Sequence, residues 1–204
     1  MQSRRRYYRS GLSATNLLKA DRKSCQQCLI VLSSNLDTRG LCHSRGGSKV
    51  YLYLVQHAEA KTEQEDPARP LSLAGLDSIE KTARLLSEEV RPSVNTIFHS
   101  GKTRARQTAE ILADHVNPSG GVKEAEGLQP GADPSIWAER LTGTADNVML
   151  VGHLPHLGRL ASLLLSGDQT KSLVNFHNAG IVCLVALEPG AWSIEWAIVP
   201  GLCG

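Results

Sequence analysis

After residue 49 the chain alternates between short apolar runs and longer amphipathic segments. The runs have the length and aliphatic content of buried strands, and they lie at 50–55, 94–98 and 147–151, with a shorter candidate at 122–125. The amphipathic segments predict helices at about 75–89, 103–115, 134–141 and 155–165. Two further runs, 180–187 and 192–199, flank a Pro-Gly turn and predict a hairpin. We therefore expect an α/β fold: a three-layer sandwich with a mostly parallel central sheet, helices on both faces and an antiparallel edge hairpin.

Three of the predicted strands end in polar groups that a buried strand does not need for packing. Gln56-His57 follows the first run, His99-Ser100-Gly101-Lys102-Thr103-Arg104 follows the second, and Gly152-His153 follows the run at 147–151. The carboxyl ends of parallel strands meet at one edge of a sheet, where ligands bind in folds of this class. These side chains are therefore expected to converge.

The converging residue types suit a tetrahedral anion. An arginine fork matches phosphate oxygens, a neutral imidazole can attack phosphorus, and the first turn of the helix at 103–115 adds free N–H groups. A lone histidine at a strand end is more often a hydrogen-bonded structural residue. It is the threefold repetition of polar strand ends that favours a phosphate site.

Four segments resemble the histidine phosphatase superfamily, and within it the short SixA-type phosphohistidine phosphatases. Leu54–Ala60 resembles the superfamily's Arg-His-Gly/Ala motif, and Arg69–Gly75 is similar to its R-P-L-[ST]-x-x-G segment. Ser100–Ala109 resembles the S-x-x-x-R-A-x-Q-T segment, the most specific of the set, and Val151–Pro155 resembles the second-histidine motif. The likeness covers about residues 49–200, with the four segments in the right order.

The resemblance implies roles for individual residues. His57 would be the nucleophile and become transiently phosphorylated, while Arg104 and His153 would bind the phosphoryl group and stabilise its charge. Arg69 would be a further phosphate contact. Glu59 would orient His57 or assist a proton transfer, although a solvated loop carboxylate is an equally good interpretation of it.

Gln56 departs from the resemblance, because the superfamily usually has arginine at this position. It is still a candidate phosphate-binding residue, since its amide can donate a hydrogen bond. The loss of a charge-assisted bond costs roughly 1.5–3 kcal/mol, or about one to two decades in rate if the bond forms in the transition state. Two functions stay open: a slower phosphatase, and a catalytically weak or inactive phosphate- or phosphoprotein-binding pseudo-phosphatase.

The remaining polar residues near these motifs are expected to have structural or peripheral roles. His99, His156 and His177 do not occupy the catalytic positions, and Lys102 and Arg106 are expected to form a basic rim. No believable cluster of metal ligands follows residue 49, so we expect neither a metal nor a cofactor.

The expected substrate is a phosphorylated protein of the histidine-phosphotransfer type. Between the helix at 103–115 and the strand at 147–151, a turn, a short strand and a short helix use all the residues, which leaves no segment to cover the site. An open site suits a phosphate carried by another protein. A phosphoramidate also leaves more readily than an alkoxide once its nitrogen is protonated, so it depends less on a strong built-in acid.

The first 48 residues differ in composition from the rest. Residues 1–50 contain ten Lys/Arg and two acids, a net charge of +8, so the remainder carries −6 of the total +2. We interpret 1–48 as a basic, mostly disordered extension, with one short ordered piece around Cys28 to Ser33, and 49–204 as the α/β domain. An organellar transit peptide, a nucleic-acid-binding arm and a zinc site on Cys25, Cys28, Cys42 and His43 are the alternatives, the last weakened by the adjacency of Cys42 and His43.

The five scattered cysteines lack the spacing of a disulfide framework and suit a reducing compartment. We therefore expect a cytoplasmic protein, with organellar targeting by the basic extension as the alternative. No apolar run reaches the roughly 20 residues of a membrane helix. The acidic domain lacks aromatic stacking platforms, so nucleic acid is not expected as a partner. The sequence gives no indication of the oligomeric state.

Overall fold

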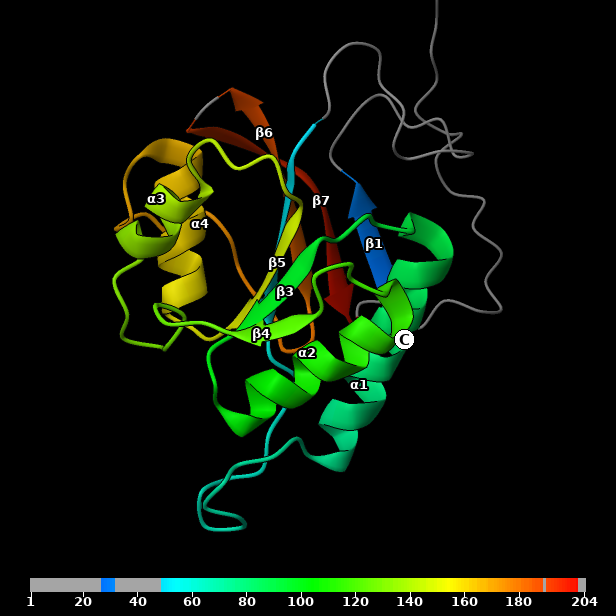
Figure 1. Cartoon of the computed structure of the whole chain (residues 1–204). Coiled ribbons are helices and arrows are strands. Elements are labelled where there is room, and N and C mark those ends of the chain that lie inside the picture. Colours follow the sequence, from blue (N-terminus) through cyan, green and yellow to red (C-terminus); the bar gives the residue numbers. More distant parts are fainter. Residues whose placement is uncertain (1–26, 32–48, 189, 202–204) are drawn as a thin grey trace, which may run out of the picture.

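Within the described residues, one seven-stranded sheet forms the centre of the molecule (Figure 1). The computed structural model describes residues 27–31, 49–188 and 190–201. The strands of this part of the chain are β1 (Gln27–Val31), β2 (Tyr51–Gln56), β3 (Thr96–His99), β4 (Val122–Glu124), β5 (Val148–Gly152), β6 (Ile181–Glu188) and β7 (Ala191–Pro200). Their order across the sheet is β1-β7-β6-β2-β5-β3-β4.

Helices cover both faces of the sheet. They are α1 (Leu73–Leu85), which continues into a π-helical turn η1 (Leu86–Val90), α2 (Thr103–Val116), α3 (Ser135–Leu141) and α4 (His156–Ser166). In Figure 1, α1 and α2 lie on one face, and α3 and α4 lie on the other. Side chains of a strand alternate between faces, so Tyr53 and Val55 pack in the core beneath α1 and α2, whereas Leu52 and Leu54 pack beneath α4.

The predicted α/β architecture is confirmed, including the helices on both faces and the antiparallel hairpin. Strands β2, β5, β3 and β4 are parallel, whereas β6 and β7 run antiparallel to their neighbours. The hairpin does not end the sheet, because β1 pairs antiparallel with β7 and forms the edge. Among the described strands, three pairings between neighbours are parallel and three are antiparallel.

Strand β1 overlaps the short ordered piece predicted around Cys28 to Ser33. The other residues of the basic extension, including the alternative zinc ligands Cys25, Cys42 and His43, lie outside the described residues. No helix within the described ranges is long and apolar enough to cross a membrane.

The parallel half of the sheet determines where the polar strand ends meet. Gln56 at the end of β2 is in register with Gly152 at the end of β5, and His99 at the end of β3 is in register with Val151. The residues that follow these three strands therefore emerge side by side at one edge of the sheet.

Candidate active site

His57 leaves β2 with its ring held in one tautomer. Its backbone N–H donates to Gly152 O of β5 at 3.1 Å, which fixes the backbone at the sheet edge. Its Nδ1 lies 2.7 Å from Ala58 O, and because a carbonyl oxygen only accepts, Nδ1 must carry the proton. Nε2 then has the lone pair, and it accepts a hydrogen bond from Arg104 Nε at 3.1 Å. The ring thus presents a potential nucleophile to a cation.

His153 lies beside this ring. The two imidazole centroids are 4.8 Å apart and the rings are inclined by 59°. His153 is 2% exposed, and its Nε2 lies 2.6 Å from the Ser100 hydroxyl oxygen. Because Ser100 follows β3, residues from the ends of three neighbouring strands meet here.

Two arginines supply the positive charge of the site. Arg104 is in the first turn of α2, whose N-cap residue Lys102 makes no side-chain capping bond, so the helix N-terminus can also attract an anion. Arg69 comes from the loop before α1, has a left-handed backbone with φ of 48°, and donates from Nε to Lys61 O at 3.3 Å. The charge of Arg69 contributes to lowering the pKa values of both His57 and Arg104.

Both histidines of the site are neutral at pH 7. Burial lowers the pKa of His57 to about 4; the hydrogen bond to Ala58 O opposes this effect, and the charges of Arg104 and Arg69 add smaller lowering effects. Burial also lowers the pKa of His153 to about 3, assisted by His57 and Arg104. Without a bound anion, His153 is therefore a neutral hydrogen-bonding group, and the arginines are the cations of the site.

These lowered pKa values predict that stability falls on acidification. Burial also lowers the pKa of His156 to about 4, so between about pH 6.5 and pH 4 the unfolded chain binds protons at His57, His153 and His156 that the folded protein does not. The free energy of unfolding should decrease through that window as pH falls. Denaturant unfolding of wild type and His156→Leu from pH 7 to 4.5 checks this. The free energy of unfolding of the variant should depend less steeply on pH, because its unfolding takes up about one proton fewer. An equal slope in both proteins would contradict the assignment.

Thr108 and Gln107 join the motif segments. Thr108 Oγ1 accepts from Ala58 N at 3.1 Å and donates to Arg104 O at 2.7 Å, so it connects the segment that follows His57 to the helix that holds Arg104. Gln107 Oε1 accepts from Leu71 N at 2.8 Å and anchors the segment that follows Arg69. Gln107 and Thr108 therefore link the segments that carry His57, Arg69 and Arg104.

Thr108→Val is expected to destabilise the protein by about 1–3 kcal/mol, because it leaves the buried Ala58 N–H without its acceptor while keeping the side-chain volume. Denaturant unfolding measures the loss. The matched control is Thr142→Val, which removes an exposed hydroxyl bonded to Ala138 O and should change stability by less than about 0.5 kcal/mol. Equal effects of the two substitutions would refute the linking role of Thr108.

Glu59 has a partner other than His57. Its carboxylate accepts from Ser72 Oγ at 2.7 Å, and its backbone O accepts from Ser72 N at 3.0 Å. Ser72 is the N-cap of α1, and Gly75 of the same turn approaches so closely that an added Cβ would lie 2.0 Å from Glu59 O. These contacts give Glu59 a role in positioning the N-terminus of α1. Its side chain is exposed to solvent.

Gln56 is held by an amide from the loop before β6. Its Nε2 donates to Asn178 Oδ1 at 2.5 Å, and its backbone O accepts from Ala179 N at 3.1 Å. Its Oε1 is buried and has no hydrogen-bond partner among the described residues. One of the two N–H donors that could replace arginine at this position is thus engaged by Asn178.

The other histidines and basic residues lie around this group. His99 Nδ1 accepts from Gly101 N at 3.1 Å, which is a structural role. His177 is exposed. Lys102 is exposed but close enough to contribute to the lowered pKa of His153, whereas Arg106 faces Glu110 on the surface of α2.

His156 is fully buried at the start of α4, and neither ring nitrogen has a partner within the described part of the chain. Across residues 27–31, 49–188 and 190–201, no group of three His, Cys, Asp or Glu side chains could hold a metal ion.

Sequence reasoning did not single out Ser100 or Asn178 as site residues. Ser100 is the first residue of the Ser100–Ala109 segment, so its place in the motif that this segment resembles was an available signal. Asn178 lies 122 residues from Gln56 in the chain, in a loop without a motif, and only the fold brings the two amides together.

Known structures share this fold. The protein histidine phosphatase SixA complexed with tungstate is 24% identical, with a TM-score of 0.66 over 74% of this chain and 97% of that chain. A provisionally assigned phosphohistidine phosphatase SixA from Agrobacterium tumefaciens is 22% identical, with a TM-score of 0.60 over 74% of this chain and 99% of the other. A phosphoglycerate mutase from Plasmodium falciparum is 18% identical, with a TM-score of 0.54 over 72% and 89%.

No family model and no curated protein sequence matches the chain. The structural neighbours agree with the resemblance carried by the four motif segments. The chain therefore has the fold of SixA and of the other histidine phosphatase structures.

Proposed function

We propose that this protein is a phosphatase that transfers a phosphoryl group to His57 Nε2 and then to water, and that its substrate is a phosphohistidine protein. The observation that carries the proposal is the fixed tautomer of His57. Nδ1–H is committed to Ala58 O, and the lone pair of Nε2 faces Arg104 with His153 alongside. A neutral, oriented imidazole beside two arginines is suited to accept phosphorus.

The proposed reaction has two in-line displacements. The phosphoryl group binds between Arg104, Arg69 and His153, and Arg104 exchanges its bond to His57 Nε2 for bonds to phosphate oxygens. Nε2 forms the N–P bond while the bond to the leaving group breaks and that group takes up a proton. Water then attacks phosphorus, the N–P bond breaks, and inorganic phosphate and neutral His57 are released.

A phosphoramidate substrate is supported by the contacts of Glu59, the acidic residue that is closest to His57 in the sequence. Glu59 is tied to Ser72 at the α1 N-cap, so it is not poised to protonate an alkoxide leaving group. A phosphohistidine leaves more easily once its nitrogen is protonated, and solvent can supply that proton. The shared fold does not choose the substrate, since a mutase has it as well.

The test compares three substrates: a phosphorylated histidine-phosphotransfer domain, phosphoimidazole and a sugar phosphate. We expect kcat/KM to be at least about tenfold higher for the phosphohistidine domain than for the sugar phosphate. A preference for the sugar phosphate would reject the substrate class. Release of phosphate from none of the three would reject the phosphatase.

The second candidate is a pseudo-phosphatase that binds phosphate or a phosphoprotein without turnover. It is favoured by Gln56, which lacks the usual arginine charge and gives one of its two amide N–H donors to Asn178. The two candidates differ in one respect: both bind the phosphorylated domain, but only the phosphatase releases phosphate from it.

Gln56→Arg is expected to raise kcat/KM by about one to two decades, because it restores a charge-assisted bond worth roughly 1.5–3 kcal/mol. Initial rates on phosphoimidazole measure the change. Ser119→Arg is the control, since it adds the same charge just beyond the C-terminal end of α2, the opposite end from Arg104. A rate for Gln56→Arg that equals that of Ser119→Arg would mean that the charge at position 56 does not limit catalysis.

A further inference from the structure

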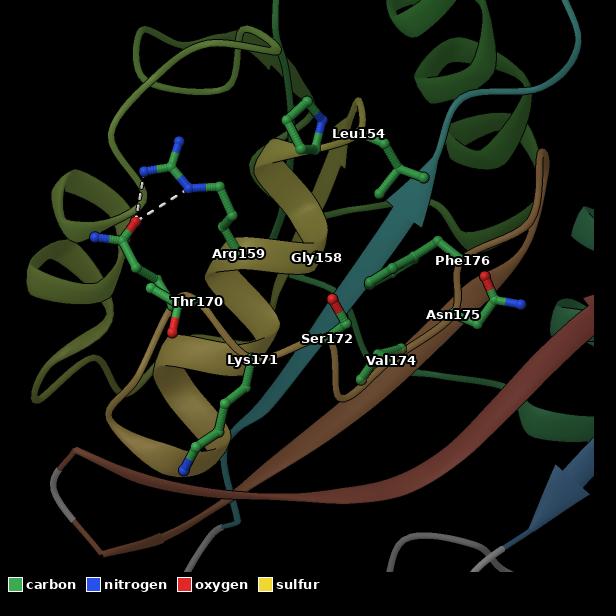
Figure 2. A pocket seen from close by; sticks show the side chains of 11 residues that line it. Leu154, Gly158, Arg159, Thr170, Lys171, Ser172, Val174, Asn175 and Phe176 are labelled. Carbon is green, nitrogen blue, oxygen red and sulfur yellow. Dashed lines mark hydrogen bonds between the residues drawn. The ribbon is translucent and has the colours of Figure 1, made fainter.

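A groove of about 790 Å³ lies between α4 and the segment 169–176 (Figure 2). Leu154, Val174 and Phe176 give it apolar walls, and in Figure 2 the Phe176 side chain points toward α4 below Leu154. Leu154 is 43% exposed, so its side chain offers apolar surface to a ligand. Cavities of roughly 300–1,000 Å³ enclose a drug-sized ligand, so this groove is far larger than a phosphoryl group requires.

Each wall of the groove contains a residue that is close in the chain to a residue of the candidate active site. On one wall, Leu154 directly follows His153. On the other wall, Phe176 is two residues before Asn178, which holds Gln56. A molecule with its phosphoryl group at His57 could therefore extend into the groove.

The charged residues that line the groove are both cations, Arg159 and Lys171. The Arg159 guanidinium is held by the neutral amide oxygen of Gln169, at 3.1 Å from Nε and 2.5 Å from Nη2, so its charge is not cancelled by that partner (Figure 2). Asp133 and Asp168 lie near these cations but are not part of the lining. An occupant with acidic side chains matches this charge.

We infer that the groove binds the polypeptide of the phosphoprotein substrate, as a segment carrying both apolar and acidic side chains. The inference rests on the proposed function and names the part of the substrate that the phosphoryl site does not contact. Apolar side chains of the segment cover Leu154, Val174 and Phe176, and acidic side chains face Arg159 and Lys171. The groove then distinguishes a phosphoprotein from a small phosphoramidate.

Gly158 allows a steric test, because it lines the groove from α4 without a side chain. A Cβ there would lie 3.7 Å from Leu154, which is ordinary contact, so Gly158→Ala fits and Gly158→Trp fills the groove. We expect Gly158→Trp to lower kcat/KM for the phosphorylated domain by about tenfold or more, with phosphoimidazole turnover unchanged. Gly158→Ala should act as wild type on both substrates. Equal loss on both substrates, or no loss on the domain, overturns the proposal.

Lys171 allows an electrostatic test, since its side chain is exposed. Lys171→Glu should lower kcat/KM for the phosphorylated domain by about tenfold and weaken its dependence on salt, without changing phosphoimidazole turnover. Lys123→Glu is the matched control, an exposed lysine on the edge strand β4. If Lys123→Glu reduces turnover of the domain as much as Lys171→Glu does, the effect is one of overall charge and the groove is not the site.

A binding assay separates failure of this inference from failure of the proposed function. Fluorescence anisotropy of the labelled phosphorylated domain is measured with His57→Ala, with and without Gly158→Trp. Weaker binding in the double variant supports the groove even if no turnover is seen in wild type. Equal binding by the two proteins rejects the groove, whatever the catalytic result.

Discussion

His57→Ala is expected to lower phosphate release by at least about four orders of magnitude, because the substitution removes the only atom proposed to bond to phosphorus. The imidazole has few structural contacts to lose: its ring bonds are to Ala58 O and Arg104 Nε. Loss of activity should therefore occur without loss of fold. Steady-state phosphate release and thermal unfolding, measured on the same preparations, check both statements.

The matched control is His115→Ala, which removes a histidine paired with Glu80 at the far end of α2. This variant should retain wild-type turnover to within about twofold, since a surface pair contributes less than about 1 kcal/mol. Turnover of His57→Ala within tenfold of wild type would show that another group, or bound water alone, attacks phosphorus.

Arg104→Ala is expected to lower kcat by about two to three orders of magnitude, the usual cost of removing one donor that stabilises charge in the transition state. Arg104 also contributes to lowering the pKa of His57, so its removal should raise that pKa above about 4. The acid limb of the rate profile should therefore move to higher pH. Arg104→Lys keeps the charge but not the planar guanidinium. The kcat of this variant should therefore lie between those of wild type and Arg104→Ala, and the acid limb of its pH–rate profile should stay near that of wild type.

Single-turnover rates from pH 3.5 to 8 measure the two effects of Arg104 separately. An unchanged acid limb in Arg104→Ala would mean that Arg104 has no electrostatic effect on His57. Equal rates for Arg104→Ala and Arg104→Lys would mean that a positive charge at this position does not raise the rate unless it is carried by a planar guanidinium group.

The strands and helices of the parallel half were predictable because their patterns are local. Buried parallel strands read as apolar runs, and β2, β3 and β5 begin and end within two residues of the predicted bounds. Helix α1 begins two residues earlier than expected, because Ser72 caps it through Gly75 N. The convergence of the strand ends followed from parallel topology alone.

The edge of the sheet was not predictable, because strand pairing over long sequence distances leaves no local pattern. Val31 pairs with Trp196, and nothing in the run around Cys28 to Ser33 identifies β7 as its neighbour. The same holds for the pairing of Gln56 with Asn178, which depends on the loop before β6.

The protonation of the site also required the structure. Sequence places His153 beside His57 but does not give its burial, and burial is the main reason why its pKa falls to about 3. His153 is therefore a neutral hydrogen-bond donor or acceptor, paired with Ser100. Glu59 was assigned from its position next to the nucleophile, and the structure gives it Ser72 as a partner.

The most direct test of the central claim is to trap the phosphorylated protein and locate the phosphate. Wild type is mixed with the radiolabelled phosphohistidine domain, quenched in alkali within milliseconds to seconds, digested, and mapped by mass spectrometry. We predict phosphate on His57 at Nε2, because Nδ1–H is committed to Ala58 O. Turnover with phosphate trapped on a different residue, or with none trapped on His57 at any time, would contradict the account.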